Sequence, residues 1–328
     1  MKVAVVAVTF NSADDLEVSL PGLEDGFDGF DWHLYVADNL STDATTATVR
    51  RLVPEATVID MGRNAGYAAG INAGVAAASS DGYDVLVIMN VDIKVPPGVM
   101  GPLVTALEEP GVGIAVPRLT RGDGSLITSL RREATVLRLA GDAALGAERA
   151  GRRPRWGETV VDPAVYERKA TSDWAAGPFL ACSRQCLERT GRWDERFFLY
   201  SEETDFCLRA RDLGYAVSYV PEVTVSHFEG ASRSAPPLFA LLTLNRVRLY
   251  RKRHGLAATA LFWLVAIGRE LLRLPADRAL HGAALAALLR DEAPAPAPAS
   301  VDAGWLRLAA PLEAADPGAA HERHQPGS

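Results

Sequence analysis

The chain has 328 residues, of which 48% are hydrophobic and 23% charged, and its formal net charge is -7. This composition is ordinary for a folded protein with a large core, and the negative charge argues against a nucleic-acid-binding protein. The three cysteines, Cys182, Cys186 and Cys207, exclude a disulfide framework and fit no zinc-ligand spacing. We therefore expect a reducing compartment.

The apolar segments of the chain are all short. The run near the N-terminus is too short for a secretory signal, and no cleavage site follows it. The longest run, residues 256–267, falls short of the roughly 18–20 residues that a membrane-spanning helix needs. We therefore expect a cytoplasmic protein.

Residues 1–92 alternate short apolar runs with longer mixed segments. We expect strands at 3–8, 33–37, 57–60 and 85–89, and helices at 13–23 and 65–78. Strands that alternate with helices predict an α/β fold with a mostly parallel, Rossmann-like sheet. Polar residues follow the strand ends, and ligands of such sheets bind at that edge.

The rest of the chain predicts three further parts. Residues 120–171 are Arg-rich with weak periodicity, which predicts an irregular excursion that carries a helix near 134–149, before a second ordered block at 174–234. Residues 238–289 are expected to be helical with a break at Pro275. We expect a globular domain at 1–235, a helical extension at 236–290 and a disordered Pro/Ala-rich tail at 291–328.

Asp38 and Asn39 follow the second expected strand. These residue types favour Asx-type turns, which would give them a purely local role. A carboxylate at a strand end could also accept a hydrogen bond from the imide of a nucleobase. The sequence leaves both interpretations open.

Gly66, Gly70 and Gly74 are spaced by four residues and would share one face of the helix expected at 65–78. Each glycine costs a helix roughly 1 kcal/mol, so close approach of a ligand or of the sheet should offset that cost. The segment is neither a Walker loop nor a dinucleotide-binding fingerprint, because no Gly-Lys-Ser/Thr follows and it does not come after the first strand.

Asn90 and Asp92 end the expected strand at 85–89 and would point the same way in an extended chain. Oxygen ligands suit Mg²⁺ or Mn²⁺, which proteins often hold through one or two carboxylates together with substrate phosphates. A single aspartate at a strand end is also a common turn former.

An acidic cluster, Glu202-Glu203-Thr204-Asp205, precedes a helix expected at 206–213, with Ser201 as its N-cap. Acidic residues near a helix N-terminus complement the helix dipole. The alternative is that one of them is a general base. His227 follows near the end of another extended segment, where a histidine is structural or a ligand.

These motifs together resemble the family 2 inverting glycosyltransferases of GT-A fold, and in particular the bacterial rhamnosyltransferase-like members. The resemblance covers residues 3–233 and depends on the order of six motifs: VTFNS, DNLSTD, RNAGYAAGINAG, MNVD, WDERFFLYSEETDFCLRARDLGY and SHFEGAS. It implies inverting displacement at an anomeric carbon, with a divalent metal that neutralises the diphosphate leaving group.

The resemblance also implies roles for individual residues. Donor binding falls to Thr9, Asn11, Asp38, Asn64, Gly66, Asn72, Asn90 and Asp92. Mg²⁺ or Mn²⁺ would be held by Asp92 and His227, the base would be Glu203, and the acceptor side would include Trp174, Gly177 and Glu202. The sequence departs from many relatives at Asn90, where they have Asp, and at Glu203, where they have Asp after Glu. The first departure is common in the rhamnosyltransferase-like group, and the second leaves Glu202 as a rival base.

The favoured donor is deoxythymidine-diphosphate rhamnose, followed by a uridine-diphosphate sugar, and the acceptor is a saccharide or a lipid-linked saccharide in cell-envelope or polysaccharide synthesis. One alternative is a catalytically inactive module that only binds nucleotide sugars. A nucleotidyltransferase is disfavoured, because such enzymes open with a Gly-rich basic loop and this chain has Thr9-Phe10-Asn11-Ser12 there.

A basic cluster within residues 246–253 precedes the apolar run at 256–267. Its members are Arg246, Arg248, Arg251, Lys252 and Arg253. Such a segment can lie on an anionic membrane surface, which would place the protein peripherally on the inner face of the cell membrane. It can equally be a helix that packs on the globular domain, with arginine stems covering apolar surface.

Overall fold

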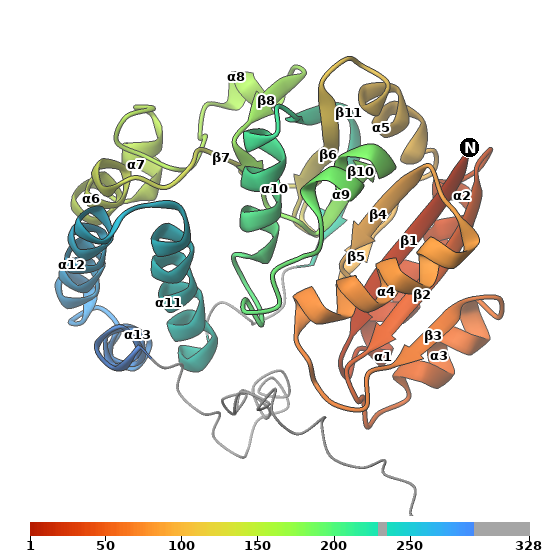
Figure 1. Cartoon of the computed structure of the whole chain (residues 1–328), viewed down its shortest axis with the longest axis horizontal. Helices are drawn as coiled ribbons and strands as arrows, with labels where there is room; N and C mark the ends of the chain where they lie inside the picture. Colours follow the sequence, from red (N-terminus) through yellow and green to blue (C-terminus); the bar gives the residue numbers. More distant parts are fainter. Residues whose placement is uncertain (229–234, 292–328) are drawn as a thin grey trace, which may run out of the picture.

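The computed structural model describes residues 1–228 and 235–291. Figure 1 shows a central twisted sheet with helices on both faces and a separate group of helices at one side. Within the described residues, nine strands form the main sheet in the order β3-β2-β1-β4-β10-β6-β11-β5, with β8 paired to β11.

The central strands β1, β4, β6 and β10 follow from runs of β-branched and aliphatic residues that are buried on both faces, whereas β3, β5 and β8 are short and partly exposed. The strands of the main sheet are β1 (Lys2–Thr9), β2 (Asp31–Asp38), β3 (Thr57–Asp60), β4 (Val85–Met89), β5 (Ile93–Lys94), β6 (Val112–Thr120), β8 (Ala170–Ser172), β10 (Phe179–Ser183) and β11 (Ala216–His227). β1 to β4 are mutually parallel, β10 runs against both β4 and β6, and β11 is parallel to β6. The sheet is therefore mostly parallel, as predicted.

The helices divide between the two faces of the sheet. One face is covered by α1 (Ala13–Ser19), η1 (Leu20–Gly22), α2 (Leu23–Gly26), α3 (Thr45–Leu52) and α5 (Met100–Leu107), and the other by α4 (Tyr67–Asp81), α9 (Arg184–Thr190) and α10 (Glu202–Asp212). Alternate residues of β1 enter the two hydrophobic clusters, with Val5 on one side and Val6 on the other. This is the pattern of a sheet buried between two helical layers.

The glycines of α4 have a packing role. An added Cβ at Gly70 would come within 2.6 Å of Val8, and one at Gly74 within 2.5 Å of Val6. The helix therefore sits directly on β1, and close packing offsets the helix cost of these two glycines. Gly66 does not share their face, because it lies before the helix with φ 89°.

The middle of the chain is more ordered than the sequence predicted. It contains β6, β7 (Leu130–Arg131), α6 (Val136–Leu145), α7 (Ala147–Gly151), α8 (Pro163–Tyr166), β8 and β9 (Trp174–Ala175), with β7 and β9 forming a small second sheet. The helix expected at 134–149 is interrupted at Gly146, whose φ of 79° ends α6. The strands β6 and β10 were not predicted, whereas β11 corresponds to the extended segment that was expected to end near His227.

The C-terminal helices are α11 (Pro236–Arg253), α12 (Leu256–Arg273) and α13 (Arg278–Arg290). The break expected at Pro275 is present between α12 and α13. These helices pack with α6 around Tyr250, Phe262 and Leu288. The predicted boundary at residue 235 adjoins the start of α11, and the predicted disordered tail lies outside the described residues except for Asp291.

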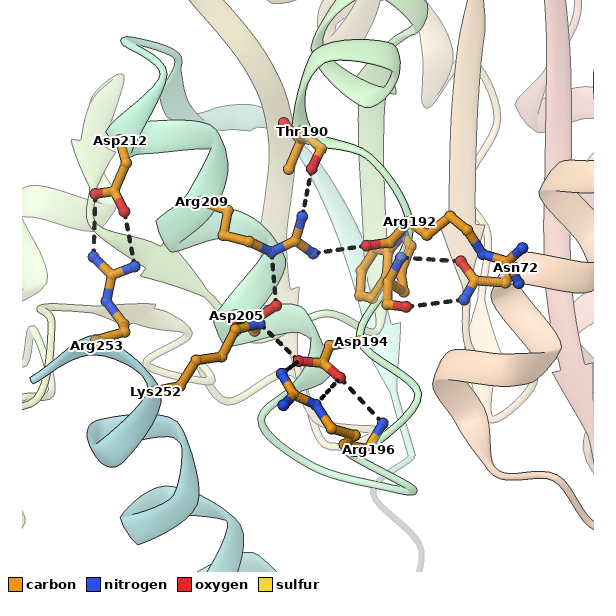
Figure 2. A network of polar contacts seen from close by, with 11 residues as sticks. Asn72, Thr190, Arg192, Asp194, Arg196, Asp205, Arg209, Asp212, Lys252 and Arg253 are labelled. Atoms are coloured by element: carbon orange, nitrogen blue, oxygen red, sulfur yellow. Dashed lines mark hydrogen bonds and ion pairs between the residues drawn. The ribbon is translucent and has the colours of Figure 1, made fainter. Parts of the chain in front are cut away.

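The basic cluster of α11 is mostly engaged in ion pairs. Arg246 pairs with Glu158, Arg248 with Asp291, and Arg253 with Glu133 and Asp212. Lys252 contacts Asp194 at 2.7 Å and the buried Asp205 at 2.6 Å, as Figure 2 shows. The packed-helix interpretation is thus correct for this cluster, and an exposed basic surface made by all five residues is not.

Candidate active site

The loops after β1 and β2 are held together by a buried carboxylate. Asp38 Oδ1 accepts hydrogen bonds from Thr9 Oγ1 at 2.7 Å and Ser41 Oγ at 2.6 Å, and Oδ2 accepts from the Ser41 amide at 2.9 Å. Asn11 Oδ1 accepts from the Thr42 amide at 2.8 Å. A carboxylate has about four acceptor positions, so Asp38 keeps one for a ligand while it forms the expected turn.

The next loop leads into α4. Asn64 is buried, and its Oδ1 accepts a hydrogen bond from the Gly66 amide at 3.1 Å. A Cβ at Gly66 would lie 2.4 Å from the carbonyl oxygen of Phe198. Gly66 is therefore required by the close approach of the segment that leads to the acidic cluster, and it joins two parts of the site.

Asp92 and His227 meet because β5 pairs with the end of β11. In that antiparallel ladder Ile93 lies opposite His227, and His227 Nε2 lies 3.1 Å from Asp92 Oδ2. Burial raises the pKa of Asp92, but the hydrogen bond and charge of His227 and a hydrogen bond from Asn90 outweigh it and leave the pKa below its ordinary value. Asp92 is thus held as a carboxylate.

This pair fits part of a divalent metal site. Two adjacent ligands of an octahedral ion, each about 2.1 Å from it, lie about 3 Å apart, and the separation found is 3.1 Å. Both side chains keep some exposure, 25% for Asp92 and 13% for His227. Among the described residues no group of three or more His, Cys, Asp or Glu side chains could hold a metal.

Tyr67 links the predicted metal site to the acidic cluster. Its hydroxyl donates to Asn90 Oδ1 at 2.8 Å, and its amide donates to the Phe198 carbonyl at 2.7 Å. Burial raises its pKa well above the ordinary value, and the charges of Glu202, Glu203 and Asp92 raise it further. The sequence analysis did not select Tyr67, although it stands inside the glycine motif that was singled out.

The acidic cluster begins in a strained turn. Tyr200 and Ser201 have φ of 68° and 73°, a region that non-glycine residues rarely adopt. Four of the five non-glycine residues with positive φ in the described chain, Asn11, Leu40, Tyr200 and Ser201, belong to the loops of this site. Such strain costs about 1–3 kcal/mol per residue and concentrates at functional sites.

Asn245 of α11 holds that turn in place. It is completely buried, and its Nδ2 donates to the carbonyl oxygens of Leu199 at 3.0 Å and Tyr200 at 3.2 Å. Ser201 occupies the N-cap position, as predicted, but its side chain makes no capping hydrogen bond. Its left-handed backbone is the reason, since a capping side chain requires an extended residue.

The two rival bases differ in environment. Glu202 is 3% exposed, and burial together with the charge of Glu203 raises its pKa well above the ordinary value. Glu203 is partly exposed, and an added Cβ at Gly177 would lie 3.3 Å from its Cβ. Glu203 therefore faces the space beside Gly177, whereas Glu202 is directed inward.

A cavity of about 330 Å³ opens beside Glu203. It lies between the small β7–β9 sheet, α6 and α10 on one side and α11 and α12 on the other, and its lining includes Trp174, Tyr200, Glu203, Tyr250, Asp142, Arg246, Arg269 and Arg273. Burial raises the pKa of Asp142 to about 6, and nearby arginines partly offset this. Aromatic rings beside carboxylates and guanidinium groups offer both stacking and hydrogen bonds to a polar ligand.

Asn72 does not lie in the site as predicted. Its Nδ2 donates to the Trp193 carbonyl at 2.9 Å and to Glu195 at 2.8 Å, and its Oδ1 accepts from the Trp193 amide at 3.0 Å. Both donor hydrogens and the oxygen of the Asn72 amide are thus bound to the segment before α10. A buried polar residue in a helix is ambiguous from sequence alone, because structural and ligand contacts require the same amide.

Known proteins are similar to this chain in both sequence and fold. Residues 4–157 match the model of the family described as Glycosyl transferase family 2. The chain is 28% identical over 247 residues to N-acetylglucosaminyl-diphospho-decaprenol L-rhamnosyltransferase of Mycobacterium tuberculosis, and the alignment covers 71% of this chain and 78% of the relative.

Two solved structures share the fold. The mannosyltransferase PcManGT from Pyrobaculum calidifontis, in complex with GDP-Man and Mn²⁺, has a TM-score of 0.52 at 20% identity, covering 88% of this chain and 75% of that one. GalNAc-T7 with UDP, GalNAc and Mn²⁺ has a TM-score of 0.53 at 14% identity, covering 76% and 48%. The predicted GT-A fold is thereby confirmed.

Proposed function

We propose that this protein, a rhamnosyltransferase-like glycosyltransferase of family 2, transfers L-rhamnose from a nucleotide-diphosphate donor to a lipid-linked saccharide in cell-envelope synthesis, with inversion at the anomeric carbon. The observation that carries the proposal is the juxtaposition of the Asp92–His227 pair with Glu203 across Tyr67. The Asp92–His227 pair can hold a diphosphate leaving group through a metal ion, and Glu203 can accept a proton.

The donor binds along the ends of β1, β2 and β4. Thr9, Asn11 and Asp38 form the nucleoside end, since the remaining acceptor position of Asp38 suits a base imide. Asn64 and Gly66 lie beside the sugar diphosphate. The donor favoured is deoxythymidine-diphosphate rhamnose, on the strength of the similarity to the mycobacterial rhamnosyltransferase, with a uridine-diphosphate sugar next.

Asp92 and His227 would hold Mg²⁺ or Mn²⁺, and the ion would neutralise charge on the departing diphosphate. The carboxylate state of Asp92 favours this role. Asn90 keeps Asp92 oriented through one hydrogen bond, and its Oδ1 accepts a second hydrogen bond from the Tyr67 hydroxyl. Asparagine at the first position of the motif is therefore compatible with metal binding, and we do not favour the inactive binding module.

Glu203 is the proposed general base. It accepts the proton of an acceptor hydroxyl while the oxygen of that hydroxyl bonds to the anomeric carbon and the bond from that carbon to the diphosphate oxygen breaks. Attack opposite to the leaving group inverts the configuration. Glu202 is disfavoured because it is 3% exposed, and burial with the charge of Glu203 raises its pKa well above the ordinary value, which disfavours the charged form that a base needs.

The acceptor sugar occupies the cavity beside Glu203, with Trp174 at one wall and Gly177 leaving room next to the base. The mycobacterial relative is named for an N-acetylglucosaminyl-diphospho-decaprenol acceptor. We propose an acceptor of the same class and a peripheral position on the inner face of the cell membrane, where such lipids would be reached from the cytoplasm.

A transfer assay tests the proposal. The full chain is incubated with deoxythymidine-diphosphate rhamnose, Mn²⁺ and a short-chain N-acetylglucosaminyl-diphospho-lipid, and the product is identified by mass and by the NMR coupling of its anomeric carbon. We expect a product with one added deoxyhexose of inverted anomeric configuration. No product should form when a chelator removes the Mn²⁺. Donor binding without transfer to any acceptor would instead support the inactive module.

A further inference from the structure

Helix α12 has an unusual distribution of apolar residues. Its buried positions, Thr259, Phe262, Ala266 and Glu270, face the neighbouring helices. Its exposed positions are all apolar: Leu256, Ala257, Ala260, Leu261, Leu264, Leu271 and Leu272. These seven positions, which we call the α12 outer face, form one stripe at the 3.6-residue period.

The exposure of the α12 outer face is large. Leu256 is 77% exposed and Leu272 is 72% exposed, while Leu261, Leu264 and Leu271 are each more than half exposed. In soluble proteins a contiguous apolar patch of this kind marks a contact surface. In Figure 1 α12 lies at the outer left edge of the molecule, away from the sheet.

The charged residues of α12 lie on its other side. Arg269 pairs with the fully buried Glu270, and Arg273 donates to the Asp142 carbonyl at 2.9 Å. Both arginines line the cavity that contains Glu203. One side of the helix thus contributes to the proposed acceptor cavity, and its other side is an uncharged apolar surface.

We propose that the α12 outer face inserts into the hydrocarbon boundary of a lipid membrane and so presents a lipid-linked acceptor to the cavity. This inference rests on the proposed function, because only a lipid-linked acceptor gives the membrane a reason to lie next to that cavity. The face carries no charge with which a protein partner could form ion pairs, and a lipid interior requires none.

The helix lies on the membrane and does not cross it. In the described part of the chain, no helix combines the length and apolarity that a membrane span requires. Three residues of the basic cluster, Arg248, Lys252 and Arg253, are paired with carboxylates. Binding is therefore driven by apolar burial, and its dependence on salt and on anionic lipid is weak.

Vesicle flotation with the full chain tests this proposal. Vesicles of phosphatidylcholine alone, or with one-fifth phosphatidylglycerol, are used at low and high salt without donor or acceptor. We expect binding to both vesicle types at both salt concentrations. Leu264→Ser together with Leu272→Ser should reduce the bound fraction at least tenfold, whereas Val18→Ser with Leu213→Ser, at exposed apolar positions elsewhere, should not.

Three results would overturn the proposal. One is no binding of the full chain to either vesicle, and the second is equal binding by the two double variants. The third is that light scattering finds the full chain dimeric without lipid and finds only the Leu264→Ser, Leu272→Ser variant monomeric. The α12 outer face would then bind a second copy of the chain. Because no substrate is present, these outcomes are independent of whether rhamnose is transferred in the assay above.

Discussion

The two sides of the proposed site, its donor side and its acceptor side, are built in different ways. The donor side uses loops at neighbouring strand ends, tied by short hydrogen bonds such as those of Asp38 with Thr9 and Ser41. The acceptor side depends on α11, which reaches back through Asn245, Lys252 and Arg253 to segments more than 40 residues earlier. The donor side is therefore a property of the sheet, and the acceptor side depends on the docking of the C-terminal helices.

That difference predicts separable effects. Variants in the strand-end loops should change donor and metal use with little effect on docking of the helices. Variants in α11 should change turnover or stability and leave donor affinity unaltered.

Asp92→Ala should have the largest effect. It removes the carboxylate proposed as the principal metal ligand, so metal-dependent transfer should fall by about 10³-fold. The fold should persist, because Asp92 is at a partly exposed strand end. His227→Ala should cost less, about tenfold, since water or diphosphate can replace one ligand. Asp28→Ala, at an exposed turn, is the control, and near-normal metal-dependent turnover in Asp92→Ala would reject the metal assignment.

Asn245→Ala tests the dependence of the base on α11. Without the amide, the strained turn at Tyr200 loses two hydrogen bonds and Glu203 loses its fixed position. We expect kcat to fall about 10- to 100-fold, because small displacements at a reacting centre are costly. Donor affinity, measured by titration, should not change. The control is Thr243→Ala, whose hydroxyl bonds only within α11 to Phe239; an equal loss of donor affinity in Asn245→Ala would contradict the separation of the two sides.

Lys252→Met should destabilise the docking of α11. Its ammonium group is 2.6 Å from Asp205 Oδ1, and the side chain of Asp205, which is 1% exposed, keeps only Arg209 as an ion-pair partner among the described residues, on Oδ2 at 2.7 Å, when Lys252 is replaced. We expect a loss of about 2–4 kcal/mol in the free energy of unfolding by urea. The matched change Arg152→Met, in a surface pair with Glu148, should cost less than about 0.5 kcal/mol. Equal effects would show that α11 docks by apolar contacts alone.

Asp142→Asn should cause the smallest change in the free energy of unfolding, and it should stabilise the protein where Lys252→Met destabilises it. Burial raises the pKa of Asp142 to about 6 from 3.8, so the folded chain binds a proton more readily than the unfolded chain. The wild-type protein therefore loses stability as the pH rises from about 4 to 6, and the loss persists above that. The Asn variant avoids this loss and should be about 1–3 kcal/mol more stable at pH 8, with a smaller difference at pH 4. A variant less stable than wild type at pH 8 would show that Asp142 is needed as a charge.

The sequence supported the donor side better than the acceptor side for a physical reason. The end of each parallel strand can be located from its apolar run, so Asp38 and Asp92 were identified with their strands. Asn72 was misassigned because the sequence does not show whether a buried amide binds a neighbouring segment of the chain or a ligand. The acceptor cavity could not be predicted, since it forms only when Asp142, Glu203 and Arg273 are brought together from three distant segments. The sequence did single out the apolar run at 256–267 as a possible membrane-surface segment, but which of its residues are exposed is set by how the helices pack.

The most direct test of the account compares turnover in Glu203→Gln and Glu202→Gln under saturating donor, acceptor and Mn²⁺. We predict that Glu203→Gln lowers kcat by at least about 10²-fold with unchanged donor affinity, that Glu203→Asp keeps partial activity, and that Glu202→Gln remains near wild type, because Glu202 is buried and its raised pKa disfavours the charge that glutamine lacks. Loss of turnover in Glu202→Gln with retention in Glu203→Gln would contradict it and assign the base to Glu202.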